Sequence, residues 1–493
     1  MLSKNKKHKH KKMKLEEIEQ LISRYENEGL ELEPDREKRS EYMSKVSEYS
    51  EQFLDDIHNK KAFINDYKND GAFDNFPFEE TPTNPEQLID FLKQNVDRAG
   101  INPASGGHIG YIPGGGIYGA AIGDYLAAVM NRYSGVFFAT PGAVRIENQI
   151  IDWVGELVGY EKGFGGNLAS GGSMANLIAI STARLAKNIK SNEIENSTIY
   201  LTKQAHHCVT KALKIVGLHE IQLRYIAMDS KYRMIPELLV EQIEKDKAEG
   251  LTPFMLVASA GSTDVGAIDP LNKLADISDK YNLWYHIDGA YGGFFLLCDE
   301  TKDKLKGINR ADSVILDPHK GMFLPYGVGI VLVKDVKHLL EANSYDANYM
   351  QDTKDYQQEY SPADLSPELS RHFRGLRMWV PMKLHGIAPF RACLSEKIWL
   401  TRYFYEKVQA LGFEVGPEPE LTVAAFRFVP KSGDANELNK KLLNIIHNDG
   451  RVFISSTTLD GEFWMRIAVL SFRTHKYHLD IILELLEEGM GGV

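Results

Sequence analysis

The chain contains the stretch Ser313-Val314-Ile315-Leu316-Asp317-Pro318-His319-Lys320-Gly321. The first four residues predict a short buried strand, because a continuous apolar run that ends at a turn signal is typical of a parallel sheet. Lys320 therefore follows the end of a buried strand, where a solvent-facing charge is poorly placed. A lysine amine in that position is well suited to form a Schiff base with an aldehyde. This hypothesis requires further residues of a definite kind upstream of Lys320.

The residues around this stretch alternate between helical and strand-like patterns. Helical patterns such as 236–247 and 271–281 lie between short apolar and β-branched runs. The alternation predicts an α/β fold with a mostly parallel sheet and helices on both faces, and a site formed by loops at the carboxyl ends of the strands. The predicted strands are Thr198–Thr202, Ile221–Met228, Phe254–Ala258, Leu283–Ile287, Ser313–Leu316 and Val328–Val333.

Four segments are expected along the chain. Residues 1–14 contain seven lysines and no acidic residue, which predicts a solvated, disordered basic tail. Residues 15–100 have the pattern of charged amphipathic helices, and residues 101–385 hold the alternating pattern of a large domain. Residues 386–493 predict a small α+β domain, because helical patterns there flank two further strand-like runs.

Composition limits the classes of function. The 493 residues carry a net charge of -11, which argues against nucleic acid as a partner. No run of about 18 apolar residues occurs, so we expect neither a transmembrane helix nor stable membrane association, and the basic tail lacks the apolar core of a secretory signal. Cys208, Cys298 and Cys393 show no metal-ligand or disulfide spacing, which favours a reducing, cytoplasmic location.

A glycine-rich stretch precedes one of the apolar helical patterns. It reads Ala169-Ser170-Gly171-Gly172-Ser173-Met174-Ala175-Asn176. Small residues let the backbone approach an anion, and a helix N-terminus offers unpaired N–H groups and the positive end of a dipole. Gly172 and Ser173 are therefore candidate phosphate ligands. Gly-Gly-Ser also marks ordinary turns, and the spacing is neither that of a Walker loop nor that of a dinucleotide-binding motif.

Further candidate side chains follow other predicted strands. His206 could stack on a planar cofactor ring, although a histidine there is also common as a satisfied surface residue. Asp288 could pair with a protonated pyridine nitrogen, while Ala290 and Thr263 could line the ring. Each feature is common alone. An anion cradle, a histidine, a strand-end aspartate and Lys320, in that order, predict pyridoxal 5'-phosphate (PLP) as the cofactor.

These motifs resemble those of the group II PLP-dependent amino-acid decarboxylases, which include aromatic-amino-acid, glutamate, tyrosine and cysteine-sulfinate decarboxylases. The resemblance extends from about residue 85 to the C-terminus. It implies the PLP-dependent transferase fold type I, with a mostly parallel seven-stranded sheet, and a homodimer with active sites at the subunit interface. The matching residues are Tyr111-Ile112-Pro113, Ser170–Asn176, Ala205-His206, Gly261-Ser262-Thr263, His286–Gly293, Asp317–Lys320, Arg371–Trp379 and Phe463–Val469.

The resemblance also implies a role for each matching residue. The residues expected to contact the cofactor are Lys320 for covalent attachment, Gly172, Ser173 and His319 for the phosphate, His206 for the ring face, Asp288 for the ring nitrogen, and Thr263 and Ala290 for the ring edge. The residues expected to contact substrate are Tyr111, Ile112 and Arg466. Arg466 is the candidate for the substrate α-carboxylate, although a strand arginine with a purely structural role fits the same position.

A mobile loop completes the site in this family, and its tyrosine protonates the carbanion in the neighbouring subunit's site. The corresponding loop is expected at about 345–365, where we predict Tyr360 as the donor among four tyrosines. Two departures leave the substrate open. Many relatives carry tryptophan after the lysine, where this chain has Gly321, and aromatic-selective members often have an aromatic residue at the position of Ile112.

The predicted function is decarboxylation of an L-amino acid to its amine and carbon dioxide. One alternative is another PLP reaction on the same fold, such as carbon–carbon lysis or transamination. A second is an aldehyde synthase, which is favoured if the loop tyrosine is functionally absent. A third is a non-catalytic binding protein, against which the intact pair of Lys320 and Asp288 argues. Aromatic, acidic and basic substrates all remain open.

Overall fold

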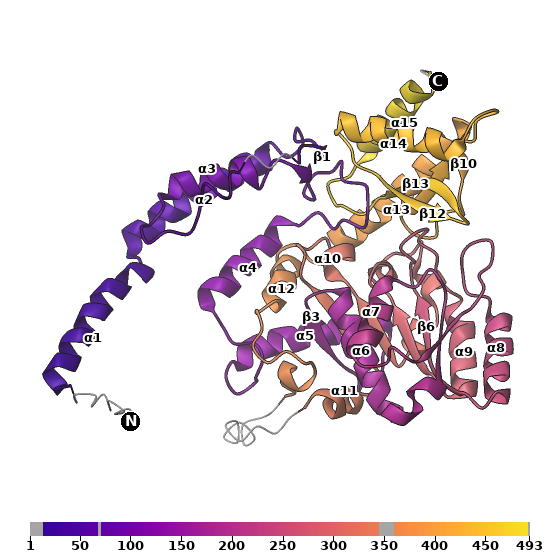
Figure 1. The fold of residues 1–493 in the computed structure, drawn as a ribbon, viewed down its shortest axis with the longest axis horizontal. Helices are drawn as coiled ribbons and strands as arrows, with labels where there is room; N and C mark the ends of the chain where they lie inside the picture. Colours follow the sequence, from indigo (N-terminus) through magenta and orange to yellow (C-terminus); the bar gives the residue numbers. More distant parts are fainter. Residues whose placement is uncertain (1–12, 68–70, 345–358, 492–493) are drawn as a thin grey trace, which may run out of the picture. The chain divides into compact units, whose positions relative to one another are not determined.

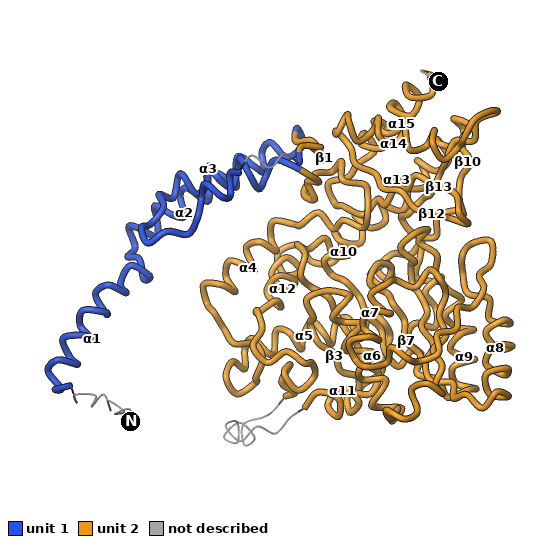
Figure 2. The backbone as a smooth tube through the Cα atoms, viewed as in Figure 1, with its two compact units in different colours: residues 1–59, 67–99 blue, residues 60–66, 100–493 orange. Residues whose placement is uncertain are grey.

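The computed structural model describes residues 13–67, 71–344 and 359–491. The chain forms two compact units, one of residues 1–59 with 67–99 and one of residues 60–66 with 100–493 (Figure 2). Residues 60–66 belong to the second unit because β1 (Phe63–Ile64) pairs antiparallel with β2 (Gly100–Ile101). The segment 15–100, for which we predicted only helices, is therefore shared between the two units.

The first unit contains the predicted amphipathic helices α1 (Leu15–Gly29), α2 (Arg36–Asp55) and α3 (Pro85–Asn95). Helix α3 begins where Pro85 follows Asn84, whose side chain accepts a hydrogen bond from the next turn's backbone. Helices α2 and α3 pack against each other. No residue of α1 is buried, and its apolar side chains Leu15, Ile18, Ile22 and Tyr25 are exposed.

Within the described residues the largest sheet has seven strands, in the order β3-β9-β8-β7-β6-β4-β5. The five strands from β8 to β5 are parallel, and β9 is antiparallel to both of its neighbours. This arrangement confirms the predicted fold class. The strands are β3 (Gly165–Ala169), β4 (Ser197–Leu201), β5 (Gln222–Tyr225), β6 (Thr252–Ser259), β7 (Trp284–Asp288), β8 (Ser313–Leu316) and β9 (Gly329–Val333).

Strand β3 was not predicted, because its sequence Gly-Gly-Asn-Leu-Ala has no apolar run. Close packing explains its composition. A Cβ added at Gly166 would lie 2.5 Å from the Val331 carbonyl oxygen, and one at Gly165 would overlap the Val336 side chain. The glycines of β3 therefore allow its close approach to β9 and α11 (Val336–Asn343), while Leu168 and Ala169 join the hydrophobic cores on either side of the sheet.

Two hydrophobic cores lie on the two faces of this sheet. Successive residues of β8 alternate between them, so that Val314 and Leu316 belong to one core and Ile315 to the other. Helices α6 (Gly172–Ala186) and α7 (His207–Ile215) cover one face (Figure 1). Helices α5 (Pro141–Val158), α8 (Pro236–Ala248) and α9 (Leu271–Tyr281) cover the other.

A smaller antiparallel sheet in the C-terminal part has the order β10-β11-β13-β12. Its strands are β10 (Glu414–Val415), β11 (Val423–Arg427), β12 (Ser455–Leu459) and β13 (Glu462–Ala468), and it packs with α13 (Ala388–Ala410), α14 (Ala435–Asp449) and α15 (Lys476–Gly491). Strands β11 and β13 and helices α14 and α15 are the strand-like and helical runs expected in residues 386–493, which the structure places in the same compact unit as the large sheet. Among the described residues, no helix is both long and apolar enough to cross a membrane.

Candidate active site

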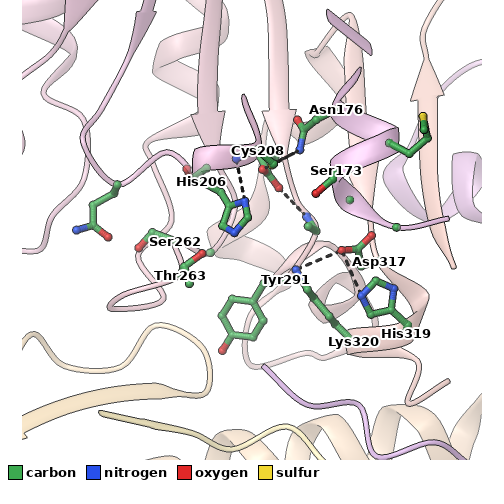
Figure 3. Close-up of a pocket in the computed structure, with 18 of the residues that line it drawn as sticks. Ser173, Asn176, His206, Cys208, Ser262, Thr263, Tyr291, Asp317, His319 and Lys320 are labelled. Carbon is green, nitrogen blue, oxygen red and sulfur yellow. Dashed lines mark hydrogen bonds and ion pairs between the residues drawn. The ribbon is translucent and has the colours of Figure 1, made fainter. Parts of the chain in front are cut away.

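A cavity of about 280 Å³ lies at the carboxyl ends of β6, β7 and β8, beside the start of α6 (Figure 3). All the residues predicted to contact the cofactor line this cavity, although they come from distant parts of the sequence. They are Gly172, Ser173, His206, Thr263, Asp288, Ala290, His319 and Lys320. The strand-end positions meet because neighbouring parallel strands end at the same edge of the sheet.

Lys320 lies in α10 (Pro318–Gly321), a single helical turn directly after β8. Pro318 favours the start of this turn because its fixed φ suits the first helical position. The Lys320 Nζ lies 3.2 Å from Asp317 Oδ2, and both side chains line the cavity. The lysine amine is therefore inside the cavity, paired with a carboxylate to which the sequence patterns assigned no role.

Asp317 is the most enclosed acidic group of this cavity, with 1% of its surface exposed. Burial raises the pKa of its carboxyl, and the charges of Lys320 and His319 oppose that effect. Among the described residues its Oδ1 has no hydrogen-bond partner. A Cβ at Gly172 would lie 2.7 Å from Oδ2, and one at Gly329 would lie 2.8 Å from Oδ1. Glycine is therefore required at both positions, and Asp317 lies directly against the predicted phosphate cradle.

The cradle is the first turn of α6. Gly171 precedes it with φ 148°, a conformation that residues with a Cβ rarely adopt. The first N–H groups of a helix have no acceptor within the helix, so those of Gly172 and Ser173 are available to an anion. The Ser173 side chain lines the same end of the cavity (Figure 3).

Asp288 ends β7 and receives hydrogen bonds from two directions. The Ala290 N–H donates to Oδ1 at 3.1 Å, and the Asn176 side-chain amide donates to Oδ2 at 3.2 Å. Asn176 is fully buried on α6, one turn after the cradle. The sequence match included Asn176 without giving it a role, because nothing in the linear pattern shows which strand its amide faces.

A chain of hydrogen bonds continues from Asn176 into the core. His286 Nε2 lies 2.8 Å from Asn176 Oδ1, and His286 Nδ1 lies 2.8 Å from Ser313 Oγ, which accepts from Trp284 Nε1 at 2.9 Å. Asn176 must donate to the carboxylate, so its oxygen faces His286 and requires a proton on Nε2. Burial lowers the pKa of His286 to about 4, which keeps its ring neutral. Every donor in the chain therefore points toward Asp288.

His206 caps the N-terminus of α7. Its Nδ1 accepts a hydrogen bond from the Cys208 N–H at 3.3 Å, which fixes the orientation of the ring and leaves the proton of the neutral ring on Nε2. Burial lowers the pKa of His206, and the charge of Asp288 opposes that effect. The cap thus presents a neutral, oriented ring to the cavity.

The residues predicted to contact substrate do not line the cavity. The Arg466 guanidinium, 3% exposed, donates to Thr263 O at 2.6 Å, Tyr111 O at 3.2 Å and Ser455 Oγ at 2.9 Å. Its side chain therefore holds together the backbone segments of Thr263 and Tyr111. Tyr111 itself is exposed and has φ 55°. Ile112 packs against the hydrophobic core that contains Val314 and Leu316.

The loop tyrosines are only partly described. Tyr345, Tyr349 and Tyr356 lie outside the described residues. Tyr360 is 48% exposed and is not among the residues that line the cavity. Its neighbour Glu359 pairs with Arg145 of α5 at 2.9 Å. The structure thus anchors the backbone next to Tyr360 without bringing this side chain to Lys320.

The residues present fit PLP. The cavity combines an amine, a hydrogen-bonded carboxylate, an oriented imidazole and a helix N-terminus that a Cβ at Gly172 would obstruct. The sequence profile of the pyridoxal-dependent decarboxylase conserved domain matches residues 78–429. The chain belongs to this family. It is a PLP-dependent amino-acid decarboxylase, a carboxy-lyase, as the motifs around Lys320 predicted.

Individual members of the family resemble the chain over most of its length. The aromatic-L-amino-acid decarboxylase of Bacillus atrophaeus is 35% identical over 405 residues, which cover 80% of this chain and 83% of that protein. Among solved structures, Oryza sativa TDC with PLP and tryptamine aligns with a TM-score of 0.88 and 22% identity, over 93% of this chain and 99% of that one. The 4-hydroxyphenylacetaldehyde synthase of Rhodiola rosea aligns with a TM-score of 0.84 and 21% identity, over 93% and 99%.

Proposed function

We propose that this chain decarboxylates an aromatic L-amino acid, releasing carbon dioxide and the corresponding amine. The 35% identity to the aromatic-L-amino-acid decarboxylase of Bacillus atrophaeus carries the choice of substrate class, and the cavity that would hold the cofactor is compatible with it. Among the described residues that line this cavity, Lys320 is the one lysine or arginine. An acidic substrate side chain would need a further cation, because an unpaired buried charge is costly. The name of the Bacillus atrophaeus relative, aromatic-L-amino-acid decarboxylase, supports the same class.

The cofactor ring would be held between three side chains. Lys320 is the point of attachment, Asp288 offers its carboxylate to the ring nitrogen, and His206 offers its ring face. When bound, PLP accepts the electron pair left at Cα by the departing carbon dioxide. The donors that converge on Asp288 fix the orientation of its carboxylate, so it would face the ring nitrogen and stabilise a proton there.

The residues proposed to position the substrate and to deliver the proton do not line the cavity themselves. Arg466 shapes the cavity wall by fixing Thr263 O and Tyr111 O, and its proposed contact with the substrate carboxylate requires one of these bonds to be exchanged. Tyr360 remains our proposed proton donor, supplied to the neighbouring subunit. Protonation at Cα distinguishes an amine product from the aldehyde of a synthase.

The homodimer is supported by the surface of the N-terminal unit. Leu15, Ile18, Ile22 and Tyr25 lie at helical spacing on one face of α1, and all are exposed. A contiguous apolar stripe of this kind marks an association surface. We propose that a second copy of the chain covers it. Light scattering of the full chain should give the mass of a dimer, and Ile18→Asp with Ile22→Asp should shift it toward the monomer.

We also propose a cytoplasmic location. Cys208, Cys298 and Cys393 are all free thiols, and the first two are buried. Unpaired thiols are typical of a reducing compartment. Fractionation of cells that produce the protein should find it with cytoplasmic markers.

Purified PLP-loaded protein can be offered tyrosine, tryptophan, phenylalanine, glutamate and lysine, with carbon dioxide and amine measured together. We expect at least one aromatic amino acid to be turned over roughly 100-fold faster than glutamate, a ratio that an unmatched buried charge can produce. Preference for glutamate would overturn the substrate class. Aldehyde with hydrogen peroxide in place of amine would identify a synthase.

A further inference from the structure

Asp317 and His319 both face the start of α6, and both present hydrogen-bond acceptors there. The carboxylate of Asp317 lies against Gly172, with an unpartnered Oδ1 among the described residues. His319 Nδ1 lies 2.5 Å from the Val328 carbonyl oxygen, which can only accept, so Nδ1 carries a proton. Burial lowers the pKa of His319, so the ring is neutral and its Nε2, 3.7 Å from Asp317 Oδ2, is an acceptor as well.

Few other charges reach this end of the cavity. Helix α6 and strand β9 contribute the uncharged residues Gly172, Ser173 and Gly329 where they pack against Asp317. Asp288 raises the pKa of Asp317 from a distance. The titratable groups that face Asp317 are Lys320 and His319 of α10, Asp288 of β7, and His206 and Cys208 at the start of α7. His319 is also faced by Tyr326 and by Arg377 of α12 (Gly375–His385), whose charge is already paired with Asp124.

A phosphate at the start of α6 would therefore meet an unfavourable charge. It carries about two negative charges near neutral pH. With the Asp317 carboxylate this makes about three negative charges opposite one ammonium, that of Lys320. Two anionic groups that share a buried site do not both remain fully ionised, and a proton then belongs to the pair of groups rather than to one atom. Such a proton would also supply the donor that this face of the cradle lacks.

We propose that the Asp317–His319 pair binds one proton when the phosphate of the cofactor binds, and loses it when the phosphate leaves. The proton turns one acceptor of the pair into a donor toward a phosphate oxygen, and it neutralises the carboxylate that would repel the anion. Cofactor affinity in this enzyme then depends on pH through Asp317. This inference rests on the proposed placement of the phosphate at Gly172 and Ser173.

Pyridoxine 5'-phosphate isolates this effect because it has the phosphate and no aldehyde. Its binding to the full-length apoprotein can be followed by calorimetry at pH 8, in two buffers of different ionisation enthalpy. We expect uptake of about one proton, and an affinity that weakens about tenfold for each pH unit between pH 7 and pH 9, as linkage to one proton requires. Pyridoxine, which lacks the phosphate, should bind without proton uptake.

Asp317→Asn preserves shape and supplies a permanent donor. This variant should bind pyridoxine 5'-phosphate with no proton uptake and with nearly constant affinity from pH 7 to pH 9. Asp312→Asn is the matched control, because Asp312 is a mostly buried carboxylate at the other end of β8 that accepts from Tyr285 N outside the cavity. The control should behave as the unaltered chain does.

Unchanged proton uptake in Asp317→Asn would assign the proton to the phosphate itself and overturn the proposal. If that variant does not fold, the two ligands decide the question on the unaltered chain, and equal uptake with pyridoxine would overturn it as well. These binding measurements involve no turnover. A different substrate class would therefore contradict the proposed function and leave this inference intact.

Discussion

Two carboxylates that line one cavity, Asp288 and Asp317, are held differently. Asp288 accepts from Ala290 N and Asn176, and behind Asn176 a chain of donors runs through His286 and Ser313. Asp317 has a single close cation, Lys320, and an oxygen without a partner among the described residues. Fixed donors stabilise a charge that must persist, whereas an incompletely partnered buried carboxyl changes its protonation readily. We therefore expect the end of the cavity proposed for the ring to stay constant on binding, and the end proposed for the phosphate to change its protonation.

Among the substitutions that test this difference, removal of Lys320 should cause the largest loss of cofactor binding and activity. Lys320→Ala takes away the proposed point of cofactor attachment and, within the part of the chain that the structure describes, the only close cation of Asp317. We expect loss of the visible absorbance of lysine-bound PLP and decarboxylation below detection. Absorbance spectra and a carbon dioxide assay check this. A spectrum unchanged in Lys320→Ala would contradict the attachment site.

Asp288→Asn should cause the second largest loss of activity. The substitution keeps the shape and removes the charge that holds a proton on the ring nitrogen, so kcat should fall by about 10²- to 10³-fold, the usual cost of one electrostatic stabiliser. Cofactor affinity should change little, because the phosphate and Lys320 remain. Steady-state kinetics with a PLP titration separates the two effects. An equal loss from Asp317→Asn in kcat would show that the two carboxylates do not differ in role.

The positions that we propose for the chemistry could be placed from the sequence, whereas the residues that support them could not. Lys320 and Asp288 stand at the ends of apolar runs, so local pattern placed them at one edge of a sheet. Strand β8 matches its predicted bounds for the same reason. Asn176 matters through partners on other elements, and Asp317 matters through its approach to Gly172 and Gly329, which no local pattern reveals. The contacts of Arg466 with Thr263 and Tyr111 likewise depend on how the small sheet meets the large one.

Asn176→Ala tests whether the donors behind Asp288 contribute to the chemistry. The substitution leaves the carboxylate in place and removes the amide that orients it, so we expect kcat to fall by about 100-fold, as small misplacements in a reacting site do. Ser181→Ala on the same helix is the control, and kinetics of both variants is the measurement. A loss confined to KM would mean that Asn176 serves binding rather than the charge of Asp288.

His286→Gln gives the smallest expected change, and it concerns stability. The pKa of His286 is about 4 in the fold and about 6.5 when unfolded, so the unfolded chain binds the proton first as pH falls. The stability that a neutral His286 allows is therefore complete above pH 6.5 and is lost toward pH 4. Linkage gives a loss of about 2 kcal/mol between pH 7 and pH 5. Glutamine does not titrate and can still donate to Asn176. Urea unfolding of the PLP-loaded protein should therefore show a loss smaller by that amount in the variant. An equal loss in both would mean that His286 is charged in the fold, so that Nδ1 donates to Ser313 Oγ while Nε2 still donates to Asn176.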